Sequence, residues 1–274
     1  MYLSCSTLVC AQKGYPQVQD ALLKIKALGF QTVDLAAFEG WQNVNPSRLA
    51  AGDDEWVEGL TRALDTTGLR VSSLNCGLSR SLTDPSPDCF AQYERELVAL
   101  QRLAERVGCP NLTVQPGRAS DPHDFGEAFE TAAGHLERLA WRFDGRPVAL
   151  SVEGHQGSLL EAPDAGVALM KRLWPAVGFT YDPSHFAMQG IPLAETEPLL
   201  DYVRHVHVRD AAPGQMQAAM GEGVVDFAWL VEALRRRGYD GAVAIEYFSG
   251  FDEGFESTAA LRELLMTLGV ERGT

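Results

Sequence analysis

Four acid or imidazole residues stand at the ends of short apolar runs in the second half of the chain. They are Glu153 in PVALSVEGH, Asp182 in VGFTYDPSH, His207 in VRHVHVRD and Glu246 in AVAIEYF. Each should lie where a buried strand passes into a loop. Three carboxylates and one imidazole suit Mn²⁺, with Mg²⁺, Co²⁺ or Zn²⁺ as alternatives. Without a cation the carboxylates would raise one another's pKa. The pattern therefore predicts a site for one divalent metal ion.

The elements that must position these residues follow from an alternation along the whole chain. Strand candidates are residues 2–9, 32–35, 69–74, 112–114, 148–152, 177–181, 203–208 and 242–245. Between them, segments such as 53–68, 89–108 and 226–241 have helical apolar spacing and end near Gly68, Gly108 or Gly238. No glycine-rich phosphate turn follows the first strand, which disfavours an open doubly wound sheet. Since only a closed barrel directs four successive strand ends at one point, we predict a single (β/α)₈ TIM barrel domain over residues 1–274.

Composition excludes several classes of protein. The 274 residues are 46% hydrophobic, which is enough for a substantial core. A formal net charge of −14, from 23 Lys+Arg and 37 Asp+Glu, disfavours a nucleic-acid partner. Five scattered cysteines without a CxxC pair indicate neither a disulfide framework nor a zinc-thiolate site. No run approaches the roughly 18–20 apolar residues of a membrane span, and the first residues lack the features of a signal peptide. We expect a cytoplasmic protein without a membrane partner.

The ordered motifs VEGH, YDPSH, HVHVRD, GEGVVDF and AIEYF resemble those of the xylose isomerase-like TIM barrel superfamily. Within it, the sequence is most similar to the sugar phosphate isomerase/epimerase branch, which includes ketose 3-epimerases, hydroxypyruvate isomerase and inosose dehydratase. The resemblance covers nearly the whole chain but does not specify a substrate. It implies that one divalent ion is ligated by Glu153, Asp182, His207 and Glu246. It also implies a small sugar or polyol substrate near His185 and Arg209, and a homodimer or homotetramer as in many relatives.

Other polar residues near the strand ends are candidates for substrate binding. His155 should share the strand face of Glu153, because side chains two residues apart point the same way. Asn75 and Gln115 follow the third and fourth strands and offer amides for hydroxyl groups. Glu222, in GEG, resembles a loop position that lies over the site in relatives, although it would also suit an ordinary turn.

Several positions keep two interpretations. Arg209 could hold an anionic or hydroxylated substrate with two hydrogen bonds, or pair with Asp210 at the rim. His185 could orient Asp182 instead of contacting substrate. For His205, a packed place inside the barrel is favoured over a ligand role. Three aromatic residues could line the pocket or pack in the core: Phe38, Trp41 and Phe186.

The reaction expected of such a site is proton transfer beside a carbonyl. In the epimerase relatives, the acids corresponding to Glu153 and Glu246 form the acid/base pair, and the resemblance implies the same roles here. One carboxylate would remove a proton from a hydroxy-ketone and the other would return it through an enediolate, while the ion polarises the carbonyl. The preferred function is therefore a metal-dependent isomerase or epimerase of a small sugar, keto-sugar or polyol-derived hydroxy-ketone.

Three alternatives remain at this level. A dehydratase of the inosose or dehydroshikimate type would expel a β-hydroxyl from the same enolate. An endonuclease IV-like nuclease would need further histidine and acid ligands for three zinc ions, whereas the third and fourth strands end in Asn75 and Gln115. A sugar-binding barrel without activity could keep all four ligands, because an intact metal site does not guarantee a productive substrate position.

Overall fold

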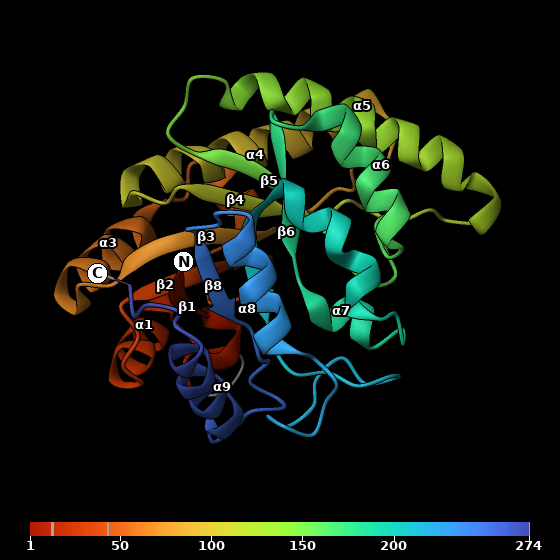
Figure 1. Cartoon of the computed structure of the whole chain (residues 1–274). Coiled ribbons are helices and arrows are strands. Elements are labelled where there is room, and N and C mark those ends of the chain that lie inside the picture. Colours follow the sequence, from red (N-terminus) through yellow and green to blue (C-terminus); the bar gives the residue numbers. More distant parts are fainter. Residues whose placement is uncertain (12–13, 43, 274) are drawn as a thin grey trace.

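The computed structural model describes residues 1–11, 14–42 and 44–273 and confirms the predicted barrel (Figure 1). Eight strands pair in parallel in chain order, and the last pairs with the first to close the sheet. The strands are β1 (Tyr2–Ser6), β2 (Thr32–Phe38), β3 (Arg70–Gly77), β4 (Asn111–Val114), β5 (Ala149–Glu153), β6 (Val177–Tyr181), β7 (Val203–Val208) and β8 (Ala242–Ile245).

Helices surround the strands on the outside (Figure 1). The α-helices are α1 (Val18–Ala27), α2 (Pro46–Ala50), α3 (Glu55–Thr67), α4 (Pro87–Val107), α5 (Phe125–Phe143), α6 (Pro163–Leu173), α7 (Pro183–Ala187), α8 (Phe227–Arg236) and α9 (Glu256–Thr267). The 3₁₀-helices in the described part of the chain are η1 (Thr7–Cys10), η2 (Pro122–Asp124) and η3 (Leu193–Tyr202). Gly68 and Gly108 end α3 and α4 in the left-handed conformation, as predicted, with φ of 63° and 67°. Gly238, with φ of 69°, follows the end of α8.

The first strand is shorter than predicted. It ends at Ser6 instead of residue 9, because the Ser6 hydroxyl accepts a hydrogen bond from the Leu8 N–H at 3.3 Å and begins η1. Thr7 then accepts a hydrogen bond from the backbone N–H of Ala36 at 2.9 Å. These bonds place η1 against β2, directly after the carboxyl end of β1.

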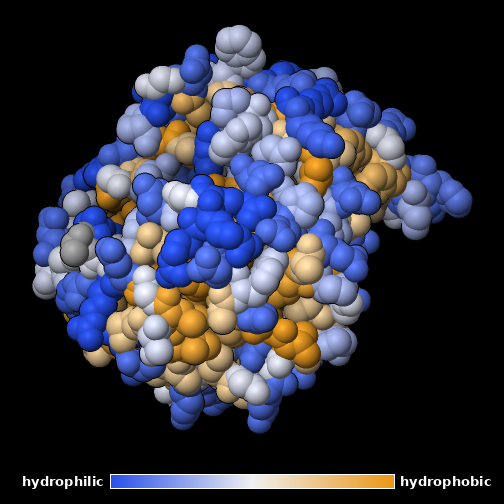
Figure 2. Space-filling view, viewed as in Figure 1, coloured by the Kyte–Doolittle hydropathy of each residue, from blue (hydrophilic) through white to orange (hydrophobic). Residues whose placement is uncertain are grey.

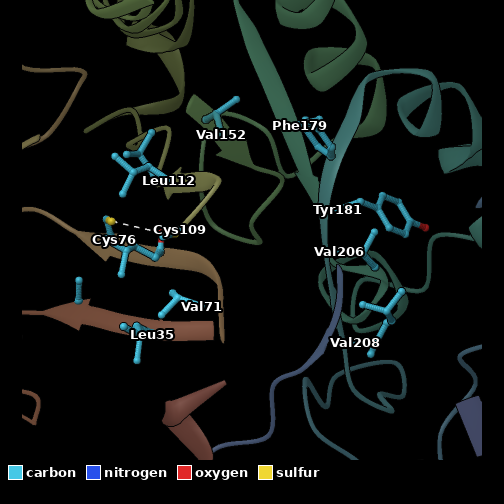
Figure 3. Packing of buried hydrophobic residues seen from close by; sticks show 14 of the residues in the cluster. Leu35, Val71, Cys76, Cys109, Leu112, Val152, Phe179, Tyr181, Val206 and Val208 are labelled. Carbon is cyan, nitrogen blue, oxygen red and sulfur yellow. Dashed lines mark hydrogen bonds between the residues drawn. The ribbon is translucent and has the colours of Figure 1, made fainter. Parts of the chain in front are cut away.

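Side chains alternate along the strands between an apolar outer face and a polar interior. Figure 3 shows buried side chains from the outer face, including Leu35, Val152, Phe179 and Val206. The interior instead contains hydrogen-bonded polar groups. The Thr113 and Thr180 hydroxyls lie 2.8 Å apart, and the Ser151 hydroxyl donates to Asn111 Oδ1 at 2.7 Å. Because these residues share faces with Glu153 and Asp182, the same alternation turns the predicted ligands toward the axis.

The described helices include none with a segment long and apolar enough to span a membrane. On the face seen in Figure 2, charged and polar residues cover the centre and apolar residues show in separate groups. The basic run at the end of α8 pairs with acids: Arg235 contacts Glu232, while Arg236 and Arg237 contact Glu197. The three arginines at this helix end are thus already paired with acids of the same chain.

The glycine of VEGH is required by packing. A Cβ on Gly154 would lie 2.5 Å from Cζ of Phe179 and 3.2 Å from Cζ of Phe186, and both rings are fully buried. We expect Gly154→Ala to reduce the free energy of unfolding by about 1–3 kcal/mol, measured by urea denaturation. Gly134→Ala, on α5 with open space around the new methyl, is the matched control and should be neutral or stabilising. Equal stability of the two variants would contradict this account.

Candidate metal centre

The four predicted ligands converge at the carboxyl ends of β5 to β8. One ligand atom from each of them lies within 4.8 Å of the ligand atoms of the other three: Glu153, Asp182, His207 and Glu246. Nδ1 of His207 lies 2.8 Å from Oε1 of Glu153 and 3.7 Å from Oε2 of Glu246. All four side chains are buried, none more than 3% exposed. The arrangement brings three carboxylates and an imidazole to one point without close contact to bulk water.

The electrostatics of this cluster fit a divalent cation. Burial, together with the charges of Glu153 and Asp182, raises the pKa of Glu246 to about 7 despite nearby cationic groups. Burial opposes ionisation of Glu153 too, but the hydrogen bond and charge of His207 lower its pKa to about 2. Although burial disfavours its charged form, His207 has a pKa well above the usual value, because Glu246, Asp34 and Glu153 surround it. A proton here supplies positive charge that a metal ion would supply instead, and the donors suit Mn²⁺, Mg²⁺, Co²⁺ or Zn²⁺.

Two amides hold the glutamates. Asn75 Nδ2 donates to Oε1 of Glu246 at 2.8 Å, and Gln115 Nε2 donates to Oε2 of Glu153 at 2.5 Å. The structure thus places both amides against predicted ligands. Oδ1 of Asn75 is buried and has no hydrogen-bond partner within the described residues, so the side chain keeps one acceptor for another group.

Arg209 lies inside the cluster, not at the rim. It is 1% exposed, and its Nη2 lies 2.7 Å from Oδ2 of Asp182 while its Nη1 lies 2.9 Å from Oε2 of Glu246. Its Nη1 also donates to the main-chain oxygen of Glu246 at 2.7 Å, and its Nε donates to the Ser184 hydroxyl at 2.9 Å. Although burial disfavours the charge, the two carboxylates raise the pKa of Arg209. The guanidinium thus fixes the orientation of two predicted ligands.

The alternative pairing of Arg209 with Asp210 is wrong. The Asp210 carboxylate accepts backbone N–H groups of the following loop, including those of Gly221 at 2.9 Å and Gly223 at 3.0 Å. These bonds shape the GEG turn and leave the Glu222 side chain exposed. No hydrogen bond or ion pair of that side chain is found within the described residues, so a substrate contact of Glu222 stays a prediction.

His155 and His185, the two histidines predicted to bind substrate, lie against each other with their rings tilted by 40°. The rings of His155 and His185 have centroids 3.9 Å apart. Burial and the Arg209 charge lower the pKa of His185 well below its usual value, so its Nε2, 3.2 Å from Arg209 Nη2, acts as acceptor. Nε2 of His185 is 3.6 Å from Oδ2 of Asp182, and the buried Nδ1 lacks a hydrogen-bond partner within the described residues. His185 therefore offers a neutral imidazole beside the cluster.

Asp34, on β2, is a functional candidate that the sequence analysis missed. Its Oδ2 lies 2.6 Å from Nε2 of His205 and 3.1 Å from Nε2 of His207. Despite full burial, these hydrogen bonds lower the pKa of Asp34 to about 2, so the carboxylate is ionised and both Nε2 atoms carry hydrogen. Nδ1 of His207 is consequently the nitrogen that faces the glutamates. The available signal was an aspartate within the apolar run 32–35, since a buried charge requires a partner.

Two strand irregularities coincide with this pair. The β2–β3 register shifts between Val33 and Asp34, and the β6–β7 register shifts where Thr180 pairs with His205. Bulges of this kind re-aim side chains. His205 lies inside the barrel, as predicted, but it is bonded to Asp34 and does not merely fill space.

The aromatic residues separate into two groups. Phe186 stacks on Tyr181, with centroids 5.8 Å apart, and both are completely buried, which supports the interpretation that Phe186 packs in the core. Phe38 and Trp41 instead pack with Phe248 around a small apolar cluster. Trp41 and Phe248 line a cavity of about 270 Å³, and Arg209 lies over the Phe248 ring at 5.1 Å. This aromatic cavity adjoins one side of the candidate metal centre.

The family model described as "Xylose isomerase-like TIM barrel" matches residues 22–266, and the chain belongs to this family. Among curated relatives, a protein provisionally assigned as hydroxypyruvate isomerase in Streptomyces coelicolor is 26% identical over 222 residues, 73% of this chain and 77% of that protein. The rhizopine catabolism protein MocC of Rhizobium meliloti is 28% identical over 140 residues, which is 44% of this chain and only 43% of that relative. Inosose dehydratase of Lacticaseibacillus casei is 26% identical over 145 residues, 46% of this chain and 49% of that protein.

Solved structures share the fold at lower identity. A D-tagatose 3-epimerase-like protein has a TM-score of 0.79 and 18% identity, and the match covers 98% of both chains. The IOLI protein with a bound zinc atom has a TM-score of 0.77 and 14% identity over 98% of both chains. A xylose isomerase-like protein from Mycobacterium smegmatis in complex with magnesium has a TM-score of 0.74 and 19% identity, covering 97% of this chain and 96% of the other. At these identities the likeness establishes the common fold.

Proposed function

We propose that this protein is a divalent-metal-dependent isomerase or epimerase of a small hydroxy-ketone, a sugar or polyol derivative. One observation carries the proposal: the carboxylates of Glu153 and Glu246 meet at one buried point, each held by its own amide donor. Their surroundings shift the two pKa values in opposite directions, downward for Glu153 and upward for Glu246. Such a divergence is typical of paired acid and base residues. Two proteins similar to this chain support the same class of enzyme: the D-tagatose 3-epimerase-like protein and the relative provisionally assigned as hydroxypyruvate isomerase.

In this proposal Glu153, Asp182, His207 and Glu246 hold the ion. When bound, the ion would polarise the substrate carbonyl and stabilise negative charge on its oxygen. Glu153 and Glu246 would exchange a proton with the carbon beside that carbonyl, one removing it and the other returning it. The free Oδ1 of Asn75 would accept a substrate hydroxyl, and burial of the cluster would keep water from the carbanion.

Metal content tests this proposal first. Elemental mass spectrometry on protein purified without chelator or added metal is expected to find about one Mn, Mg, Co or Zn per chain. Glu246→Ala should lose most of it, because the variant removes one of four ligands. Failure of the wild-type protein to bind metal even with excess Mn²⁺ would overturn the proposal and favour the sugar-binding alternative. Nearly three zinc ions per chain would favour the nuclease.

The reaction class is tested by incubating ketoses, hydroxypyruvate and keto-inositols with the protein in D₂O. An isomerase or epimerase should place solvent deuterium beside the carbonyl while retaining the carbon skeleton and the oxygen count. A dehydratase, which the similarity to inosose dehydratase favours as second candidate, would instead yield a product lighter by one water. NMR and mass spectrometry of the products separate these outcomes.

A further inference from the structure

A second cavity, larger than the aromatic one, adjoins the metal centre. It lies beside residues that contact the proposed ligands. It has a volume of about 540 Å³ and lies among the loops that follow β3, β4 and β5. Gln115 lines it and also donates to Glu153. His155 lines it as well and contacts the ring of His185. A molecule that reacts at the metal centre would therefore extend into this space.

The cavity is basic although the chain is strongly acidic. Among the described residues its lining includes Arg80 and Arg118 and contains no aspartate or glutamate. Arg80 Nε donates to Oε1 of Gln92 at 2.9 Å, which holds the guanidinium and leaves its Nη atoms without a hydrogen-bond partner in the described chain. The Arg118 side chain likewise makes no hydrogen bond or ion pair there. Both arginines are exposed at the cavity and neither pairs with an acid of the described residues, so their guanidinium groups are free to contact an anionic ligand.

Tyr93, on α4, provides a second and independent observation. Its side chain lines the cavity and is only 3% exposed, and its hydroxyl has no hydrogen-bond partner within the described residues. Buried tyrosine hydroxyls are normally hydrogen-bonded. Burial raises the pKa of Tyr93 well above its usual value, so the group stays protonated and can donate.

Hydrogen bonds between the loops hold the cavity in shape. The Thr83 hydroxyl donates to the Arg118 carbonyl at 3.1 Å, and Leu159 N–H donates to the Gly117 carbonyl at 2.9 Å. Gly117 has φ of 80°, and a Cβ there would lie 2.7 Å from the Ser81 hydroxyl oxygen. The three loops are thus tied together before any ligand arrives, which lowers the entropic cost of binding.

Nearby acids do not neutralise the lining. The pKa of Asp84 is lowered mainly by the hydrogen bond from the backbone N–H of Ser86, and the charge of Arg80 contributes less. Asp124 and Glu127 line a separate, smaller cavity that Arg118 borders on another side. None of these acids forms an ion pair with Arg80 or Arg118 within the described residues.

We propose, on the basis of the function proposed above, that this cavity binds an anionic group of the substrate, a carboxylate or a phosphate. Arg80 and Arg118 would contact the oxygens with charge-assisted hydrogen bonds, and the Tyr93 hydroxyl would donate a third. The substrate is then a hydroxy-ketone with its reacting carbons at the metal centre and its charged end between these loops. A neutral ketose would leave both guanidinium groups without a partner.

Binding of inorganic phosphate tests the subsite without turnover. Isothermal titration of the metal-loaded wild-type protein is compared with Arg80→Gln, Arg118→Gln and the control Arg62→Gln, whose arginine contacts Glu58 on the exposed surface of α3. Each cavity variant should raise the Kd for phosphate by about tenfold or more, as expected for the loss of a charged hydrogen bond. The control variant should leave this Kd unchanged. A phosphate Kd that is the same in all four proteins would overturn the subsite.

Substrate selectivity provides the second test. Deuterium exchange in D₂O is measured for dihydroxyacetone, dihydroxyacetone phosphate and hydroxypyruvate, so that the neutral compound is matched with a phosphate and a carboxylate. The wild-type protein should prefer one charged compound in kcat/KM, and the cavity variants should reduce that preference by about tenfold. Exchange that is independent of charge and of both arginines would reject the subsite and retain the isomerase. Arginine-dependent phosphate binding without exchange of any compound would retain the subsite and reject the proposed function.

Discussion

Glu246→Gln is expected to lower turnover by about 10²- to 10⁴-fold while the protein still folds. Glutamine keeps the length of the side chain and an oxygen that can accept from Asn75 Nδ2, but it cannot take up a proton. Arg209 retains its bond to the main-chain oxygen of residue 246, so the local structure keeps one of its anchors. Turnover of a substrate identified by the deuterium screen, measured at saturating metal, gives the magnitude.

Saturating metal is essential to this experiment because Glu246 is proposed as both ligand and acid/base group. Metal content and thermal melting of the variant, measured in parallel, separate lost chemistry from lost binding. Glu58→Gln, on the exposed surface of α3, is the matched control and should keep wild-type turnover. If Glu246→Gln binds metal and still turns over substrate at the wild-type rate, the acid/base assignment is wrong.

Asp34→Asn should weaken metal binding by about 10- to 100-fold although Asp34 is not one of the four proposed ligands. The ionised carboxylate accepts from Nε2 of both His205 and His207, and this fixes Nδ1 of His207 toward the glutamates. An asparagine could turn an N–H group toward these nitrogens and favour the other imidazole tautomer. Competition with a chelator measures the metal Kd, and ¹⁵N NMR of the histidine rings reports the tautomer.

The tautomer measurement distinguishes positioning from general loss of structure. His205→Gln keeps Asp34 and its bond to His207, so it should raise the metal Kd less than Asp34→Asn does. Asp65→Asn, at an exposed position of α3, should leave the Kd unchanged. An unchanged Kd in Asp34→Asn would show that the four ligands alone orient His207.

The sequence predicted the barrel because apolar runs and amphipathic segments alternate with lengths typical of strands and helices. It also predicted that the four proposed ligands meet, since each lies within one residue of a strand end and parallel strands bring their carboxyl ends to one edge. The partners of these ligands were not predictable in the same way. Asp34 and His205 are 171 residues apart and meet across the barrel, at two register shifts that local patterns do not reveal.

Arg209 illustrates a second limit of sequence reasoning. Its neighbour Asp210 suggested a local pair, but Asp210 is satisfied by backbone N–H groups of its own loop. The guanidinium instead turns inward, where Asp182 and Glu246 offset the cost of burying it. Local sequence therefore identified a charged residue near the site, while its partners depended on burial and on bonds formed elsewhere.

The order of these residues along the chain has a consequence for biosynthesis. All four proposed ligands lie in the second half of the sequence, whereas Asn75 and Gln115, which orient two of them, come from the first half. Glu246 directly follows β8, the strand that closes the barrel against β1. During synthesis on the ribosome, the nascent chain would acquire its last ligand only when its last strand emerges. The metal ion would then bind at its full set of ligands only after the barrel has closed, so that only chains with a closed barrel would hold it.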